Sequence, residues 1–349
     1  MDGIPERRWP AEWEPVGAVL LAWPHAASDW APYLDAVRAC YRGLAAAVAR
    51  HAPLLVLADD AAAVRRELLA AGVAARRAVV RDDVPYDDTW IRDYGPLAVW
   101  EDGRLRLRDF AFNGWGLKFR AAADNQATRR LHAAGAFGAT PLDTVGLVLE
   151  GGAVEGDGAG TVLTTAACLL SPNRNPHLTR AEIEGELARW LGARRVLWLT
   201  RGRLLGDDTD AHIDTLARFC PDGATILYQR CDDPGDPHFP ELAAMEAELA
   251  QLSRADGRPY RLAPLPWPAP RYCPRDGHRL PASYANLLFV NGAVLVPSYG
   301  DDVRDQAALA AVASACPGWR VEPVDCSALL WQHGALHCAT LQLPAGAVP

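Results

Sequence analysis

The sequence predicts a single α/β domain that is built from repeated modules. Runs typical of strands alternate with helical stretches along the whole 349-residue chain. A hairpin, a helix and a strand recur in that order about five times, without clear sequence identity between the units. No linker rich in Pro, Gly and Ser divides the chain. We therefore expect residues 1–349 to form one domain.

Strands are expected where short runs are rich in β-branched residues or alternate in polarity. These runs are residues 54–58, 77–83, 145–152, 194–202, 225–230 and 285–299. The last run contains Asn291 and Gly292, which tolerate the left-handed backbone of a tight hairpin turn. Asp-Gly pairs predict two more hairpins, in residues 97–110 and 153–165.

Helices are expected where apolar residues recur with helical spacing. These stretches are residues 32–50, 60–73, 124–135, 180–191, 240–253 and 303–316. The fourth has the clearest start, because Thr179 and Glu182 have the spacing of a capping box. The Pro-rich stretch 261–274 carries aromatic and apolar residues that are typical of packed chain.

Composition narrows the classes of function. The formal net charge is −8 without long runs of one sign, which gives no support for nucleic-acid binding and favours a small cationic partner. The first residues lack the apolar core of a signal peptide, and no apolar run approaches the ~18 residues of a membrane span. We expect a soluble cytoplasmic protein with no membrane partner. A homo-oligomer is compatible with the sequence.

Cysteine and lysine usage limits the chemistry further. Eight cysteines are scattered without a C-x-x-C pair, so neither a zinc ribbon nor a disulfide scaffold is expected. Most of them should be reduced thiols in the core. Lys118 is the only lysine, so an internal Schiff base would have to use it.

Four segments are dense in acids, His, Gly and Trp, although such a run taken alone is most often a solvated turn. They are residues 87–96, 149–158, 206–219 and 334–342. In the third, Asp210, His212 and Asp214 alternate with apolar residues, which predicts a strand with these three side chains on one face. A metal site is the competing interpretation, because H-x-D offers two ligands. No second His cluster with metal spacing supports it.

The first two segments offer carboxylates suited to a planar cation. Trp90 and Asp93 together provide an aromatic face and a charge partner. Alternatively, Asp93 caps a turn or pairs with Arg92. Glu150 ends an apolar strand and precedes two glycines that let backbone approach closely, which suits a buried group that orients a histidine. A simple turn at the end of a strand would look similar.

The last segment places Cys338 directly after His337. If this segment is extended, the two side chains point to opposite faces, and His337 is a poor base for the thiol. We therefore expect the base to be His212, which is flanked by carboxylates. A thiolate needs a positive neighbour to lower its pKa from about 8.5. Alternatively, Cys338 is a core thiol.

Nine motifs, in the same order along nearly the whole chain, resemble the agmatine deiminase and bacterial peptidylarginine deiminase family of the guanidino-group modifying superfamily. They are "WPAEWEP", "LLAWPH", "DDTWIRDYGP", "FNGWG", "LEGG", "TVLTTAACLLSPNRNP", "DAHIDTLARF", "SYANLLFVNGAVLVPSYGD" and "LHC". The resemblance implies a five-bladed, pseudo-symmetric α/β propeller of the pentein type with its site on the central axis. It also implies hydrolysis of a guanidinium to a ureido group and ammonia, without metal or cofactor.

The resemblance assigns roles to particular residues. Cys338 is expected to be the nucleophile that forms a covalent thiouronium intermediate, and His212 the general acid and base. Asp93 and Asp214 are expected to grip the guanidinium, while Glu150 partners His212. In addition, Trp90 and Asn286 are expected to contact the substrate.

The substrate class is the open question. The favoured substrate is agmatine, which gives N-carbamoylputrescine on the route to putrescine. Gln332 to Leu336 depart from the run of glycines and an asparagine of agmatine-specific members. Peptidylarginine or free arginine is therefore the alternative, with Lys118 and Arg120 as candidates for a substrate carboxylate or as solvated surface charges. A catalytically silent homologue that binds guanidines or polyamines is the third interpretation.

Overall fold

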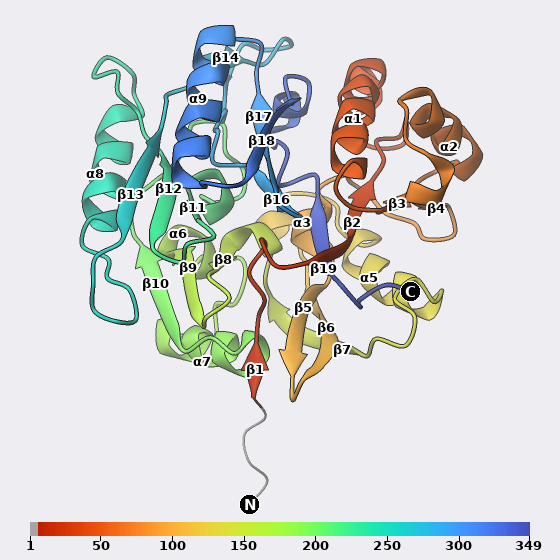
Figure 1. Cartoon of the computed structure of the whole chain (residues 1–349), viewed down its shortest axis with the longest axis horizontal. Coiled ribbons are helices and arrows are strands. Elements are labelled where there is room, and N and C mark those ends of the chain that lie inside the picture. Colours follow the sequence, from red (N-terminus) through yellow and green to blue (C-terminus); the bar gives the residue numbers. More distant parts are fainter. Residues whose placement is uncertain (1–5) are drawn as a thin grey trace, which may run out of the picture.

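The computed structural model describes residues 6–349, and five of its sheets share one connectivity (Figure 1). In each, a first strand pairs antiparallel with a second, and a third pairs parallel with the second. Parallel neighbours require a crossover, and a helix supplies it in every unit. Figure 1 shows the units arrayed around the centre of the molecule, with helices toward the outside. The fivefold repeat of hairpin, helix and strand is thus confirmed.

Four of the five units are continuous along the chain. The fifth combines a strand near the C-terminus with elements near the N-terminus. Their elements are β5 (Leu97–Glu101), β6 (Arg104–Ala111), α5 (Asp124–Ala133) and β7 (Leu142–Val148); β8 (Val154–Gly156), β9 (Thr161–Thr165), α7 (Arg180–Leu191) and β10 (Arg195–Leu199); β11 (Ala217–Phe219), β12 (Thr225–Gln229), α8 (Phe239–Leu249) and β13 (Arg261–Leu265); β16 (Leu288–Val290), β17 (Ala293–Ser298), α9 (Asp302–Ala315) and β18 (Arg320–Asp325); and β19 (Leu341–Pro344), β2 (Val16–Ala22), α1 (Leu34–Ala49) and β3 (Leu54–Leu57).

The remaining elements extend these units or connect them. β1 (Arg7–Arg8) adds to β5, while β4 (Ala78–Arg81) follows α2 (Ala61–Ala70) and adds to β3. A separate two-stranded sheet is formed by β14 (Arg271–Tyr272) and β15 (Arg279–Leu280). Single turns of helix are α3 (Ile91–Tyr94), α4 (Gly114–Leu117), α6 (Ala166–Leu169), η1 (Ala31–Tyr33), η2 (Ala75–Arg77), η3 (Gly151–Ala153), η4 (Ile213–Thr215) and η5 (Leu329–Gln332).

Local signals for turns and caps are confirmed. Asn291 and Gly292 have positive φ angles of 42° and 83°, and they join β16 to β17. The Asp-Gly pairs likewise join β5 to β6 and β8 to β9. The predicted capping box starts α7 at Arg180. All six predicted helices are present, with ends that differ from the prediction by a few residues.

Two expected strands are wrong, and both lie in the predicted site. Asp210 and Ala211 have φ angles of 67° and 66°, which no strand residue adopts, and η4 follows directly after His212. The "GALHCATLQ" segment forms a turn over residues 336–339, and its strand begins only at Leu341. Period-two alternation in the sequence therefore did not mean extended backbone at either place.

The hydrophobic core connects the units. Its main cluster contains buried side chains from Val16 to Ala347, and a second cluster lies around β11, β12 and α8. Trp267 of the Pro-rich stretch is buried in the second cluster, as its composition predicted. None of the helices within residues 6–349 combines the length and hydropathy needed to cross a lipid bilayer. That residues 1–349 form one domain stays a prediction.

Candidate active site

One pocket of about 660 Å³ collects most of the side chains that the sequence predicted for a site. Trp90, Asp93, His212, Asp214 and Cys338 all line it. They come from the start of α3, from η4 and from the turn that precedes β19. Segments far apart in the sequence therefore converge, although two of them lack the backbone conformation that was expected.

Asp93 is held in place through both of its carboxylate oxygens. Its Oδ2 accepts a hydrogen bond from Trp115 Nε1 at 2.8 Å, and its Oδ1 accepts one from the backbone N–H of Gly152 at 2.8 Å. The guanidinium of Arg92 turns the other way and lies 3.2 Å from Glu12 Oε1. The alternative in which Asp93 pairs with Arg92 is therefore wrong.

Three candidate site side chains lie close to the Cα of Gly152. A methyl group on its Cα would lie 2.7 Å from His212 Nδ1, 2.8 Å from Asp93 Oδ1 and 3.0 Å from Asp214 Oδ2. These distances are shorter than carbon contacts allow, so only glycine fits here. The pair of glycines after Glu150 thus allows backbone to approach the site, as the sequence indicated.

His212 is buried, and neither of its ring nitrogens has a hydrogen-bond partner among the described residues. Its Nδ1 lies 3.6 Å from Asp93 Oδ1. Burial disfavours the charged ring, but the negative charge of Asp93, together with Cys168 and Glu150, outweighs burial and raises the pKa of His212 well above its usual value. This direction favours the protonated ring before substrate binds.

Asp214 offers one free oxygen to the pocket. Its Oδ2 lies 2.7 Å from His337 Nδ1 and 3.6 Å from Cys338 Sγ, whereas its buried Oδ1 has no hydrogen-bond partner within residues 6–349. Burial opposes ionisation of Asp214, but the hydrogen bond and charge of His337 prevail and lower its pKa. A buried carboxylate oxygen without a partner is costly unless a ligand supplies a donor.

Asn286 lies beneath the thiol and outside the pocket lining. Its Nδ2 is 3.2 Å from Cys338 Sγ, and its Oδ1 accepts the backbone N–H groups of His337 at 2.9 Å and Cys338 at 3.3 Å. Asn286 is not among the residues that line the pocket, and its amide holds the turn that carries Cys338. That Asn286 contacts the substrate stays a prediction.

The thiol of Cys338 rests in an environment that keeps it protonated. Burial is the largest cause, and the nearby negative charges of Asp214 and Asp93 add to it, so the pKa of Cys338 is raised well above its usual value. Burial and the two carboxylates thus disfavour the thiolate in the free protein. A cation between the two carboxylates would reverse part of this effect.

The raised pKa predicts the pH dependence of alkylation. The thiolate is the reactive form, so the rate of iodoacetamide addition to Cys338 should be slow at neutral pH and still rise above pH 9. The rate is measured by mass spectrometry of the Cys338 peptide, with a small guanidinium ion added as a comparison. The guanidinium should lower the midpoint of the profile at concentrations that leave the pocket partly free. A plateau below pH 8 in the free protein would contradict the environment described.

Comparison with known proteins agrees with the geometry. The sequence profile of the Porphyromonas-type peptidyl-arginine deiminase family matches residues 8–344. The chain belongs to this family. It is 34% identical over 366 residues to the agmatine deiminase of Pseudomonas aeruginosa (strain LESB58), an alignment that covers 97% of this chain and 95% of that protein.

Solved structures of the family have the same overall fold. A provisionally assigned arginine deiminase from Porphyromonas gingivalis is 48% identical, with a TM-score of 0.91 over 98% of this chain and 100% of the other. A Cys→Ser variant of C. jejuni agmatine deiminase, solved with substrate bound, is 34% identical, with a TM-score of 0.89 over 98% and 97%. The mixed α/β fold expected from the resemblance is thus confirmed.

This family member carries a buried ion pair that the sequence did not predict. Glu150 accepts hydrogen bonds from Arg174 Nε at 2.9 and 3.0 Å, and both side chains are fully buried. Arg174 also donates to Asp210 Oδ2 at 2.7 Å and to the carbonyl of Thr209 at 2.8 Å. It therefore ties Glu150 to the segment that carries His212. Its position in "SPNRNP" was a family signal, but no local pattern indicated its partners.

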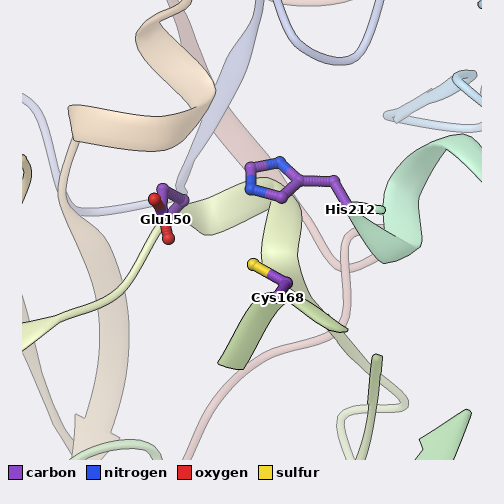
Figure 2. Close-up of side chains that lie close together, drawn as sticks. All are labelled: Glu150, Cys168 and His212. Carbon is purple, nitrogen blue, oxygen red and sulfur yellow. The ribbon is translucent and has the colours of Figure 1, made fainter. Parts of the chain in front are cut away.

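Glu150 faces His212 without a hydrogen bond to it. Figure 2 shows one ring nitrogen of His212 turned toward Glu150 and toward Cys168, and the donor atoms of all three lie within 4.8 Å of one another. Cys168 comes from α6 and was expected to be a core thiol. That Glu150 partners His212 stays a prediction.

Two groups of side chains within residues 6–349 have a spacing that could hold a metal ion. One is the group in Figure 2, which lies in the site but uses neither Asp214 nor the H-x-D spacing considered from the sequence. The other consists of Cys273, Asp276 and His278 at the mouth of the pocket.

Lys118 and Arg120 do not line the pocket. Lys118 Nζ lies 2.8 Å from Asp210 Oδ1, and the exposed Arg120 pairs with Asp87 at 2.8 Å. Both cations are thus engaged with carboxylates of the chain. The loop that departs from the agmatine pattern does line the pocket, through Gln332, His333 and Gly334.

Proposed function

We propose that the protein is a cysteine-dependent deiminase that hydrolyses the guanidinium of a small cationic substrate, with agmatine as the favoured substrate. The observation that carries this proposal is the convergence of the Cys338 thiol, the His212 imidazole and the carboxylates of Asp93 and Asp214 on one pocket. Two of the buried polar groups, His212 and Asp214 Oδ1, have no partner among the described residues. A planar cation with several N–H donors would satisfy Asp214 Oδ1, and the ring of His212 stays available for proton exchange with the substrate.

Asp93 and Asp214 are the proposed clamp for the guanidinium. Each carboxylate can accept two N–H groups from one edge of the cation, which fixes its plane and its central carbon. Asp93 is oriented by Trp115 and Gly152, so its geometry exists before substrate binds. Trp90 lines the same pocket and offers an aromatic face to the cation.

The bound cation also prepares the nucleophile. Cys338 rests as a thiol partly because Asp214 and Asp93 are negative. A guanidinium between these carboxylates compensates their charge, so the thiol proton passes to solvent and the thiolate forms where the substrate carbon lies. Binding of the cation likewise removes part of the charge that raises the pKa of His212.

The proposed reaction has two half-reactions that share His212. Sulfur adds to the guanidinium carbon, and the resulting tetrahedral centre collapses as His212 gives its proton to the departing nitrogen, which leaves as ammonia. The product on the enzyme is a thiouronium. Neutral His212 then takes a proton from water, the hydroxide adds to the same carbon, and the C–S bond breaks to release the ureido product and the thiolate.

The rest of the pocket favours a second positive charge on the substrate. Asp29, Asp88, Asp207 and Asp208 also line it, while Arg275 is the only arginine or lysine among the lining residues. Burial is the main reason that the pKa of Asp88 rises to about 6, and the like charges of Asp29 and Asp208 add to it. An ammonium group at the far end of the substrate, as in agmatine, would relieve this repulsion.

Arginine is the second candidate, and two observations favour it. Arg275 lies at the rim, where it could meet a carboxylate. The provisionally assigned arginine deiminase is also 48% identical, compared with 34% for the substrate-bound agmatine deiminase. The acidic residues that line the pocket outnumber Arg275, so agmatine remains the favoured substrate.

One panel of substrates tests the proposal. Agmatine, arginine and a blocked peptidylarginine are offered to the purified protein after treatment with a chelator, and ureido product and ammonia are measured. Agmatine should have the highest kcat/KM, and Arg275→Ala should affect arginine more than agmatine. A preference for arginine that Arg275→Ala removes would replace agmatine as the substrate. Absence of turnover with every guanidine would contradict the reaction class.

A further inference from the structure

A compact turn at the mouth of the pocket brings three metal-binding side chains together. Cys273, Asp276 and His278 each offer a donor atom, and these atoms lie within 4.8 Å of one another. All three residues line the pocket. The resemblance to deiminases assigns no role to this turn, and the proposed mechanism does not use it.

The turn is closed by its own backbone. It connects β14 to β15, and the backbone N–H of Cys273 donates to the carbonyl of His278 at 2.8 Å. Gly277 has a φ of +73° and donates to the carbonyl of Cys273 at 3.0 Å. These bonds fix the three side chains on one short hairpin, so a ligand would find the donors already assembled.

The ring of His278 faces one of the other two proposed ligands. Its Nδ1 lies 2.5 Å from Asp276 Oδ1, and its buried Nε2 has no partner within residues 6–349. With Nδ1 as the donor atom of the ring, a cation bound beside Asp276 would replace the proton that these two atoms share. His333 packs against the same ring, with centroids 5.1 Å apart.

We infer that Cys273, Asp276 and His278 bind a divalent cation of the zinc class at the rim of the pocket. A thiolate, an imidazole and a carboxylate are the ligand types that Zn²⁺ prefers, and three protein ligands leave a position for water. Binding replaces the thiol proton of Cys273, so the affinity rises with pH. The buried thiol supplies the soft ligand, which disfavours Mg²⁺ and Ca²⁺.

Occupancy would regulate access to the site. The cation would lie on the wall of a pocket whose other occupant is a cationic guanidine, and two positive charges in one pocket repel each other. The turn also contacts His333, which belongs to the segment that leads to Cys338. Zinc therefore acts as a reversible inhibitor that competes with substrate. The binding itself does not depend on the proposed reaction.

Equilibrium binding separates this site from the catalytic thiol. Zn²⁺ is titrated into Cys338→Ala protein, so that the nucleophile cannot ligate it. Adding His278→Ala or Cys273→Ser should weaken binding at least about tenfold, the usual scale for loss of a metal's immediate surroundings. The matched control is His177→Ala, because His177 is exposed and lies outside the pocket. Co²⁺ should give a thiolate-to-metal absorption band that is lost in Cys273→Ser.

Two results would contradict the zinc site on this turn, and one further result is expected if it exists. Equal zinc affinity in the His278→Ala and His177→Ala proteins would overturn the inference. Zinc that persists in His278→Ala but is lost in Cys168→Ala would place the ion in the deeper group of Figure 2 and also overturn it. In the wild type, zinc should raise the apparent KM, and His278→Ala should raise the half-inhibitory concentration about tenfold relative to its own zinc-free rate.

Discussion

Cys338→Ala should abolish turnover of every guanidine that the wild-type protein accepts. The expected loss in kcat is on the order of 10⁴-fold or more, because the first half-reaction loses its nucleophile. Water is a poor attacker of a resonance-stabilised guanidinium, and Cys338 is the thiol that lies 3.6 Å from Asp214 in the proposed clamp. The measurement is ureido product per enzyme at saturating substrate.

Controls separate chemistry from folding and binding. Cys231→Ala removes a buried thiol of the second core cluster, outside the pocket, and should retain the wild-type rate per folded molecule. The Cys338→Ala protein should still bind substrate, because Asp93 and Asp214 remain. Binding is measured by calorimetry. Turnover in Cys338→Ala within about tenfold of the wild type would show that the thiol is not the nucleophile.

Local chemistry made much of the fold predictable from the sequence. Hairpin turns depend on residues that tolerate positive φ, and the capping box depends on two side chains three residues apart, so both signals lie within a few residues. The candidate residues came from four dense segments and from the family resemblance, and most of them converge in space. Five of the seven candidates line one pocket.

The failures arose where distant contacts decide the backbone. The carbonyl of Ala211 accepts a hydrogen bond from Thr165 Oγ1 at 2.7 Å, and its N–H donates to Asp207 Oδ2 at 2.6 Å. These contacts hold Ala211 in a left-handed conformation that an alanine rarely adopts alone. The turn at Cys338 is likewise held by Asn286, 52 residues away. Thr165 and Asn286 lie outside any short sequence window around these two turns.

The same reason explains why the strand expected at His337 was wrong. The sequence separated it from Cys338 by assuming a strand, whereas the structure places both beside Asp214. The ring of His337 bridges Asp214 and Glu12, the latter 325 residues away along the chain. His337 therefore orients Asp214, which is proposed to bind the substrate. Within residues 6–349 its ring nitrogens contact these two carboxylates and not the sulfur of Cys338.

His212 and His337 should respond differently to the same substitution. His212→Asn should reduce kcat by roughly 10²- to 10⁴-fold, because an amide can donate a hydrogen bond but cannot carry a proton between the half-reactions. His337→Asn should keep most of kcat, because its amide can still donate to Asp214 Oδ2. A rise in KM is expected there, since Asp214 loses the imidazole whose hydrogen bond helps lower its pKa.

Alanine at both positions completes the comparison. His337→Ala leaves Asp214 without its donor and should lose more than His337→Asn, mainly in KM. His212→Ala and His212→Asn should be equally impaired, because neither transfers a proton. Equal loss of kcat in His337→Asn and His212→Asn would instead make His337 a proton-transfer group. The geometry argues against that result, because Asp214 and Glu12 occupy both ring nitrogens of His337. The ring nitrogens of His212 have no partner within residues 6–349, so they stay available to the substrate and to water.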